Sequence, residues 1–429
     1  MSASGPWPRL LAIMGSGETS PTMVGTHRRL VERMGPAPVP AVVLDTPFGF
    51  QANVEILTRR AVEYFRESVG LEVEVARWRS AAEGSTLEAE RSLARLRSAR
   101  YVFAGPGSPS YALRQWAGSP VPATLAAKLE QGGCLTFASA AALTLGAATV
   151  PVYEIYKVGE EPCWLEGLDL LALAGLPGMA LIPHYDNTEG GNHDTRYCYL
   201  GEPRLARLEE QLPHHGFVLG VDEHTGLVLD LDAGTASVVG RGGVTVRRQG
   251  YSTSFPSGSE VPIADLRRAG TARGDGGGPP STTAAAPRPP GDPEADAAAP
   301  ASLVAASRLL EARFVAAVDE RDVDAAVAAV LELDAAIVSW SRDTLQSDDA
   351  DQARAALRAM IVRLGELARV GASDPEERAR PFVEAVLEAR SAARAGRDWA
   401  TADALRDHLV AAGVEISDTP EGTDWRLLS

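Results

Sequence analysis

The stretch "GGCLTFASAAALTLG", residues 132–146, has the pattern of a strand, a sharp turn and a helix. Five mostly apolar residues, 134–138, lead into Ser139, and a run of alanines and leucines leads away from it. The apolar run predicts a buried strand, and the helix-forming residues behind it predict a helix. Hydrolases place a nucleophile at such a strand-to-helix turn. Ser139 is therefore a candidate nucleophile, and the structural alternative is a small residue that fills a tight corner.

The residues on either side of Ser139 depart from the usual pattern of such a turn. Glycines normally stand two residues before and two residues after the nucleophile, whereas this chain has Phe137 and Ala141. Small residues let the strand and the helix approach each other closely, and glycine tolerates strained backbone angles. We expect Ala141 to change little and Phe137 to narrow the pocket or to distort the turn.

The alternation of strand and helix extends outward through residues 1–270. Apolar runs that predict strands begin at Leu10, Ala41, Leu71, Tyr101, Cys134 and Met179. Segments with helical spacing, such as 53–69 and 86–97, lie between most of these runs. This alternation predicts an α/β fold with a doubly wound, mostly parallel sheet. After Phe217, glycine-containing turns at short intervals predict antiparallel hairpins at one edge of the sheet.

The composition changes sharply after this region. Residues 271–300 contain seven prolines and five glycines, which predicts a disordered linker. Beyond it, apolar residues step by three or four, first from Leu303 to Ala317, then from Val323 to Trp340 and from Leu357 to Leu364. This spacing predicts amphipathic helices in a small bundle. We therefore expect an α/β domain over residues 1–270 and a separate all-α domain over residues 301–429.

The composition of the whole chain limits the class of protein. The chain has 429 residues, of which 45% are apolar, and a formal net charge of −16. Its three cysteines, Cys134, Cys163 and Cys198, have no paired spacing, which favours a reducing compartment without disulfides. We find no charged-then-apolar leader and no run of 18 apolar residues, so we expect a cytoplasmic protein without a membrane partner. The sequence leaves the oligomeric state open.

Polar and glycine residues follow the strands at the edge where open α/β sheets carry their sites. The backbone N–H of Ala140, directly after Ser139, could stabilise an oxyanion at the start of a helix. In "FAGPGSPSYAL", residues 103–113, a glycine turn connects a strand to a helix, and Gly107 could supply a second donor. Pro106 has no N–H to donate.

A base and an acid are also available at strand ends. His184 ends an apolar strand in "LIPHYDNTEGGNHDTR", residues 181–196, and could take the proton of the serine and return it to the leaving group. A carboxylate could orient this imidazole. The candidates are Glu223, which follows another apolar strand, and Glu154.

A metal site is the alternative for the His184 segment. The possible ligands are His184, Asp186, His193 and Asp194. Their spacing matches no established ligand pattern, so we expect neither a metal nor another cofactor.

Taken together, these segments resemble a known family. The order "IMGSGETSP", "FAGPGSPSYAL", a serine elbow, "LIPHYDN" and "GVDEHTGL" resembles the dipeptidase E and cyanophycinase family of serine peptidases, over residues 8–250. That family has the fold of class I glutamine amidotransferases. Its elbow reads Gly-x-Ser-Ala-Gly, of which Ser139 and Ala140 match. Glu223 corresponds to the cyanophycinase-type acid and Glu154 to the dipeptidase-type acid. The resemblance implies a peptidase that acts on small or unusual peptides through an acyl-enzyme.

The end of the chain resembles a different family. Residues 382–427 are similar to the end of a cysteinyl-tRNA synthetase, including Asp418, Thr419, Gly422 and Trp425 of a closing Asp-Thr-x-x-Gly-x-x-Trp motif. The helical region from Leu303 resembles the anticodon-binding bundle of that family more weakly. The chain has no His-Ile-Gly-His-like segment for ATP. With only two lysines, it has no lysine-rich ATP loop either.

The synthetase resemblance implies tRNA as a partner, and an alternative function follows from it. The chain could be a non-catalytic, tRNA-associated protein with a degenerate amidotransferase-like domain. The charge of residues 301–429 argues against strong RNA binding, because 15 arginines face 24 carboxylates there. The basic residues that could form one stripe along a helix are Arg390, Arg394 and Arg397.

Overall fold

The computed structural model describes residues 7–188, 193–271, 302–340, 349–370, 375–419 and 422–428. The chain separates into two compact units, one formed mainly by the N-terminal α/β region and the other by most of the C-terminal region. The linker predicted over residues 271–300 lies, apart from Thr271, outside the described residues.

The central sheet of the α/β region has eight strands. In spatial order they are β14 (Glu260–Pro262), β11 (Thr235–Gly240), β10 (Thr225–Asp230), β1 (Arg9–Met14), β5 (Gly133–Ala138), β4 (Tyr101–Ala104), β2 (Ala41–Leu44) and β3 (Glu74–Ala76). The last five of these strands pair in parallel, and the first three add to β1 in antiparallel pairs. The prediction of a mostly parallel sheet with an antiparallel edge is confirmed.

A second sheet of six strands was not predicted. Its order is β13 (Tyr251–Pro256), β12 (Gly243–Arg248), β9 (Val218–Val221), β8 (Ala180–Ile182), β6 (Ala148–Thr149) and β7 (Leu165–Glu166). The strands that follow Phe217 are thus shared between the two sheets. Apolar alternation shows that a strand is half-buried or buried, but it does not show which partner the strand pairs with.

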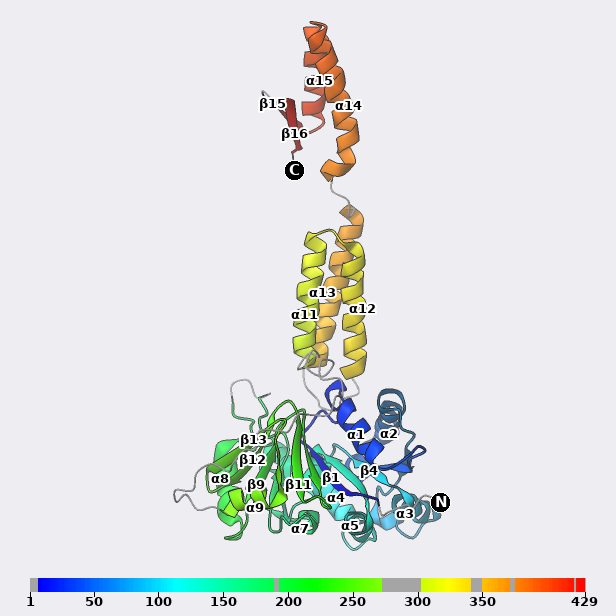
Figure 1. Ribbon diagram of the computed structural model, residues 1–429, viewed down its shortest axis with the longest axis vertical. Helices are drawn as coiled ribbons and strands as arrows, with labels where there is room; N and C mark the ends of the chain where they lie inside the picture. The colour runs from blue at the N-terminus through cyan, green and yellow to red at the C-terminus, as the bar shows by residue number, and fades with distance from the viewer. Residues whose placement is uncertain are drawn as a thin grey trace. The chain divides into compact units, whose positions relative to one another are not determined.

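The inner strands β1, β5, β4 and β2 of the central sheet are buried on both faces, as parallel strands usually are. On β1, Leu11 and Ile13 enter a core with α3 (Leu87–Ser98), α5 (Val121–Gln131) and the second sheet. Leu10, Ala12 and Met14 enter another core, with α1 (Val24–Arg33) and α2 (Val54–Tyr64). The outer face of the second sheet packs on α8 (Gly201–Gln211). Figure 1 shows α1 and α2 side by side and α8 beside the second sheet.

The remaining helices of this region are short. They are α4 (Pro109–Trp116), α6 (Ser139–Leu143), α7 (Leu170–Leu173) and α9 (Ile263–Thr271). Two short turns also matter for the site, namely η2 (Thr46–Phe48) and η5 (Glu154–Val158). Helix α6 begins where β5 ends, so the predicted strand–turn–helix at Ser139 is present.

The C-terminal region is helical, as predicted, but it ends in a β-hairpin. Its helices are α11 (Leu303–Asp319), α12 (Val323–Trp340), α13 (Asp349–Val370), α14 (Pro375–Ala395) and α15 (Trp399–Ala411). The strands β15 (Val414–Thr419) and β16 (Gly422–Leu427) pair antiparallel. The hairpin packs on α14 and α15 around Val383, Leu387 and Leu409, so the short closing motif contributes strands to an otherwise helical region. None of the helices in the described residues is long and apolar enough to cross a membrane.

The residues buried on α11 and α12 test the prediction that apolar residues spaced by three or four form the buried face of each helix. On α11, all five predicted positions are buried, namely Leu303, Ala306, Leu310, Phe314 and Ala317. On α12, Leu333 and Ile337 are buried, as the spacing predicted, whereas the predicted Val323 and Val327 are exposed and Ala326 and Ala329 are buried instead. An ion pair of 2.5 Å between Arg313 and Glu332 links these two helices. We attribute the shifted face to the alanines, since small side chains allow helices to approach closely.

Candidate active site

Ser139 stands at a strained turn between β5 and α6. Its φ angle is +49°, in the left-handed region that residues other than glycine rarely adopt. Such strain is typical of a nucleophile on a sharp strand-to-helix turn. Phe137 is fully buried in the core and packs against Trp116, with 6.4 Å between the ring centroids. The bulky side chain thus lies in the core, and the structure does not bear out the expectation that it narrows the pocket.

The structure brings Ser139, His184 and Glu223 together. His184 Nε2 lies 3.0 Å from Ser139 Oγ, and His184 Nδ1 lies 2.8 Å from Glu223 Oε1. An ionised carboxylate only accepts hydrogen bonds, so Nδ1 carries the ring proton and Nε2 accepts from the serine hydroxyl. This chain of a hydroxyl, an imidazole and a carboxylate has the geometry of a nucleophile, its base and an orienting acid.

Two neighbours of His184 hold Glu223 in place. Asn187 Nδ2 donates to Glu223 Oε1 at 3.0 Å, and the backbone N–H of Glu223 donates to Asp186 Oδ1 at 2.7 Å. Burial pushes the pKa of Glu223 up, but the hydrogen bonds from His184 and Asn187 outweigh it and hold this pKa below its ordinary value. Glu223 is therefore ionised at neutral pH, as the orienting role requires. The sequence argument did not assign supporting roles to Asn187 and Asp186.

Two glycines after β1 allow the segment that carries Glu223 to come close. A Cβ on Gly15 would stand 2.0 Å from the carbonyl oxygen of Asp222. A Cβ on Gly17, whose φ is +67°, would stand 2.1 Å from the ring of His224. The loop in "IMGSGETSP" is therefore in direct contact with residues 222–224. This close approach explains why the motif needs glycines there.

The other candidate acid has a different partner. Glu154 opens η5, and its Oε1 accepts a 2.5 Å hydrogen bond from Ser110 Oγ on α4. Nδ1 of His184 is already bonded to Glu223. The structure thus brings Glu223, and not Glu154, to the imidazole.

The two candidate oxyanion donors lie at the start of α6, at Ala140, and in the loop between β4 and α4, at Gly107. Ala140 is the second residue of α6, so its N–H has no acceptor within the helix. The next N–H, that of Ala141, donates to Gly105 O at 3.2 Å and ties the elbow to the Gly107 loop. Gly107 has a φ of +141°, and a Cβ there would stand 2.0 Å from Pro47 O. Only glycine fits this position without a shift of the backbone.

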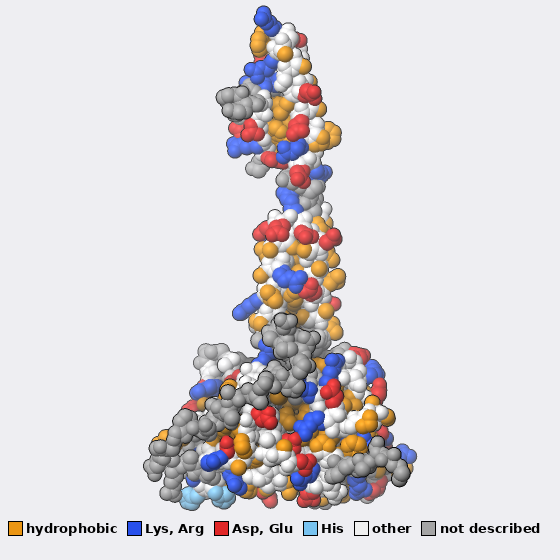
Figure 2. Space-filling view, viewed as in Figure 1, with side chains coloured by type: hydrophobic (Ala, Val, Ile, Leu, Met, Phe, Trp, Pro, Cys, Tyr) orange, Lys and Arg blue, Asp and Glu red, His pale blue; other side chains and the backbone are white. Residues whose placement is uncertain are grey.

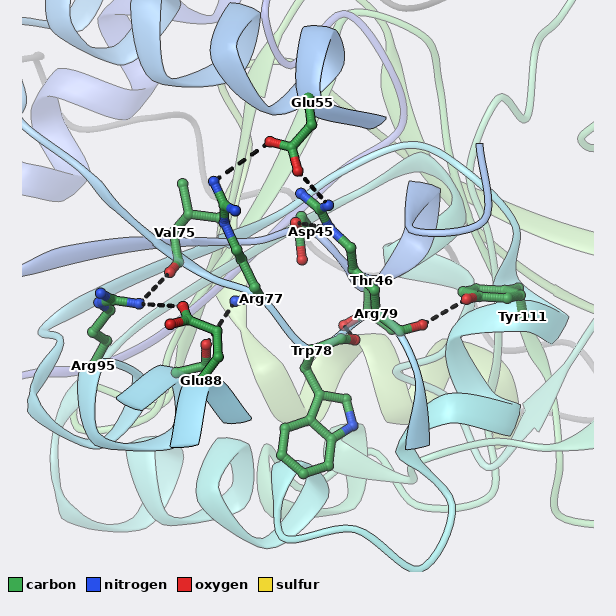
Figure 3. Close-up of polar contacts among 11 residues, drawn as sticks. Asp45, Thr46, Glu55, Val75, Arg77, Trp78, Arg79, Glu88, Arg95 and Tyr111 are labelled. Carbon is green, nitrogen blue, oxygen red and sulfur yellow. Dashed lines mark hydrogen bonds and ion pairs between the residues drawn. The ribbon is translucent and has the colours of Figure 1, made fainter. Parts of the chain in front are cut away.

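A polar cluster links η2, whose Pro47 lies against Gly107, to α4, which follows the Gly107 loop (Figure 3). Arg79 Nε is 2.6 Å from Asp45, which follows β2, and Arg79 Nη1 is 2.7 Å from Glu55. The Tyr111 hydroxyl donates a hydrogen bond to the backbone oxygen of Arg79. The Thr46 hydroxyl donates to the backbone oxygen of Trp78, the residue before Arg79. Burial raises the pKa of Asp45, and the charge of Arg79 opposes this. The cluster joins η2 to α4, the two elements that flank the loop, and the sequence argument missed it.

The residues of the metal alternative do not gather into a ligand set. Within the described parts of the chain, no group of three or more His, Cys, Asp or Glu side chains could hold a metal ion. Asp194 is instead paired with Arg196, with 2.9 Å between Oδ1 and Nε. His184 is engaged with Ser139 and Glu223.

Comparison with known proteins finds two different kinds of relative. The family profile of the cysteinyl-tRNA ligase anticodon binding domain matches residues 380–426. The cysteine–tRNA ligase of Beutenbergia cavernae is 39% identical over 123 residues, which are 26% of this chain and 26% of that protein. The ligase of Paenarthrobacter aurescens is 38% identical over 125 residues, 28% of this chain and 25% of that protein. The chain spans about a quarter of the length of these curated relatives.

Solved structures match another part of the chain. A peptidase from an acI-B1 actinobacterium has a TM-score of 0.48 and 18% identity, and the match covers 59% of this chain and 97% of that one. A peptidase E-like protein from Listeria monocytogenes EGD-e has a TM-score of 0.35 and 13% identity, with 58% and 98% covered. The chain thus resembles peptidase E-like structures over its N-terminal part and cysteine–tRNA ligases over its C-terminal region.

Proposed function

We propose that the α/β region is a serine hydrolase, specifically a peptidase that acts on small or unusual peptides. The observation that carries this proposal is the hydrogen-bonded chain from Ser139 through His184 to Glu223. The strained backbone of Ser139 supports it, because it presents the hydroxyl on a sharp turn at the start of a helix. We place the protein in the cytoplasm, because its cysteines are free and a reducing compartment suits them.

The reaction would proceed through an acyl-enzyme. Ser139 Oγ attacks the carbonyl carbon, and His184 Nε2 takes the hydroxyl proton and then gives it to the leaving amine. The N–H groups of Ala140 and Gly107 stabilise the oxyanion. Water repeats the sequence on the acyl-enzyme and releases the acid. Glu223 keeps the imidazole in the required tautomer and stabilises the imidazolium, so the chemistry requires no cofactor.

A fluorophosphonate probe tests the nucleophile without a known substrate. The full-length protein should be labelled on Ser139, and Ser139→Ala should remove the label. Ser110→Ala is the matched control, because Ser110 is also a buried serine bonded to a carboxylate, Glu154. Absence of labelling in the wild type at high probe concentration, or equal labelling of Ser139→Ala, would refute the proposal.

A second candidate function concerns tRNA, and the profile match over residues 380–426 favours it. In this alternative the protein is tRNA-associated and its α/β region is inactive. Of the three arginines predicted to form a stripe, Arg390 is buried, with 5% of its surface exposed. Only Arg394 and Arg397 are exposed and could contact RNA. With 15 arginines against 24 carboxylates in residues 301–429, we expect weak binding that is lost at physiological salt.

A filter-binding titration of tRNA against the full-length protein separates the two functions. Submicromolar affinity that persists at physiological salt and falls in Arg394→Glu would favour the tRNA-associated alternative, above all if Ser139 is not labelled. We also expect no charging of tRNA with cysteine, because the sequence has no ATP-site motif.

A further inference from the structure

Residues 197–199 form a strained turn that the proposed reaction does not use. Tyr197, Cys198 and Tyr199 have φ angles of +62°, +56° and +66°. This left-handed region is unfavourable for residues that carry a side chain, and such residues normally enter it singly rather than in succession. Strain of this kind persists only where the surrounding structure enforces it, and it gathers at functional sites. The contacts of the turn indicate what the strain serves.

The 197–199 turn is hydrogen-bonded to the backbone of the candidate base. The N–H of Cys198 donates to His184 O at 3.1 Å, and the N–H of Tyr197 donates to Tyr185 O at 3.0 Å. His184 itself has a φ of +48°, so its backbone is strained as well. The two bonds hold successive carbonyl groups, and the turn therefore fixes the backbone from which the imidazole extends.

The side chain of Tyr199 contacts the imidazole directly. The two rings have their centroids 6.4 Å apart, with an angle of 42° between their planes. The Tyr199 ring also contacts Tyr156 of η5, with 5.1 Å between the centroids and an angle of 31°. Both separations lie in the range in which aromatic rings attract each other. Because Glu154 of η5 is bonded to Ser110 on α4, this support of Tyr199 is itself anchored.

A buried cluster of charges anchors the turn at its other end. The Tyr197 hydroxyl donates to Glu202 Oε2 at 3.1 Å. Arg247 donates to the same oxygen from Nη1 at 2.9 Å and to Glu209 Oε2 from Nε at 2.9 Å. Both Arg247 and Glu209 are buried. Hydrogen-bonded charges in a buried network hold their partners in one geometry, so Tyr197 fixes the start of the turn and Tyr199 extends to the base.

We propose that Tyr199 is a positioning residue that holds the imidazole of His184 in line between Ser139 and Glu223. This inference rests on the proposed function of Ser139 and His184. Both hydrogen bonds of the imidazole lie close to the plane of its ring, so they permit the ring to tilt about the line that joins its two nitrogens. A second ring packed against the imidazole opposes this tilt. Nε2 therefore stays where it receives the serine proton and returns it to the leaving amine.

The kinetics of fluorophosphonate labelling test this proposal in the full-length protein. Labelling at several probe concentrations gives the apparent affinity for the probe and the maximal rate constant of the covalent step. Tyr199→Ala should lower the maximal rate constant by about tenfold and keep the apparent affinity within about twofold, because a loosely held base slows proton transfer. Tyr199→Phe keeps the ring and should keep the wild-type rate constant. An unchanged maximal rate constant in Tyr199→Ala, a loss of affinity alone, or an equal fall in Tyr199→Phe overturns the proposal.

A matched control separates Tyr199 from any tyrosine close to η5. Tyr153 directly precedes η5, and 45% of its surface is exposed. Tyr153→Ala should keep both the apparent affinity and the maximal rate constant of the wild type. If this variant slowed as much as Tyr199→Ala, truncation near η5 would be enough to disturb the site, and the proposal would fail.

A third variant separates a positioning role from a structural one. Leucine in Tyr199→Leu fills apolar space but is too short to contact the imidazole as the tyrosine ring does. Its Tm should therefore lie closer to that of the wild type than the Tm of Tyr199→Ala, while its maximal rate constant should still fall. A wild-type rate constant in Tyr199→Leu would show that Tyr199 only fills space and would overturn the proposal. This variant also serves if Tyr199→Ala does not fold.

A proton signal reports the orientation of the imidazole without catalysis. The proton on His184 Nδ1, which is shared with Glu223, should give a low-field NMR resonance while the ring is held in place. This resonance should be sharp in the wild type and in Tyr199→Phe, and broadened or lost in Tyr199→Ala. Equal signals in the wild type and Tyr199→Ala overturn the proposal. Failure of Ser139 labelling in the wild type would instead refute the proposed function, so the two failures are distinguishable.

Discussion

The two regions of the molecule differ in where they bury polar side chains and in how densely large apolar side chains are exposed on their surfaces. The α/β region buries polar groups at the ends of its strands, including Ser16, Glu18, Asp45, His184 and Asn187. The helical region instead leaves large apolar side chains exposed, including Leu331, Val362, Phe382 and Trp399. Figure 2 shows apolar side chains scattered over these helices. Buried polar groups are held in one geometry, which suits chemistry, whereas exposed apolar side chains suit contact with other molecules.

The largest effect is expected at Glu223, the residue that we propose orients His184 in the α/β region. Glu223→Gln removes the charge that orients His184, and we expect hydrolysis of an activated ester to slow by about 10²–10⁴-fold. Glu154→Gln is the matched control, because Glu154 bonds to Ser110 and should change the rate by less than about threefold. The reverse ranking would transfer the orienting role to Glu154.

A smaller effect is expected at the Gly107 loop. Gly107→Ala forces a Cβ against Pro47 O and displaces a candidate oxyanion donor, so we expect the ester hydrolysis rate to fall by about 10²-fold. Gly234→Ala is the control, since Gly234 also has a positive φ but has open space around it. That variant should lose about 1 kcal/mol of stability and keep its rate. Equal rates for both variants would remove Gly107 from the proposed site.

Acid should destabilise the α/β region through His27. Burial lowers the pKa of this histidine from 6.5 to about 4, so between these values the unfolded chain binds more protons than the folded one. The free energy of unfolding therefore falls as the pH falls from 6.5 to 4, by about 3 kcal/mol in total. Urea unfolding at several pH values measures this slope.

The control compares slopes rather than absolute stabilities. His27→Phe should lose most of the pH dependence in this window, whatever its effect on stability at neutral pH. His215 is exposed, and His215→Asn should keep the slope of the wild type. A full slope in His27→Phe would assign the acid sensitivity to other groups.

The smallest effect is expected when the two regions are separated. Residues 1–270 alone should be labelled at Ser139 at a rate within about twofold of the full-length protein, because Ser139, His184 and Glu223 all lie within this range. Residues 301–429 alone should fold and bind tRNA as weakly as the whole chain. Loss of labelling in residues 1–270 would show that the helical region takes part in the reaction.

Local sequence patterns are enough to predict the succession of strands and helices and the candidate residues at the strand ends. The apolar run before Ser139 indicated β5, and the spacing from Leu303 to Ala317 indicated the buried face of α11. Both signals are local, because the periodicity of a strand or a helix depends only on residues close together in the sequence. Ser139, His184 and both candidate acids were therefore identified before their distances were known.

Which of these candidates come into contact depends on how the strands and loops pack. Glu223 and Glu154 both stand in plausible local contexts, but strand order and the glycine loop after β1 bring only Glu223 to His184. The burial of Arg390 and of Glu18 was likewise not evident from the sequence. Contacts between residues far apart in the chain depend on how the sheets and helices pack, and local patterns do not encode that packing.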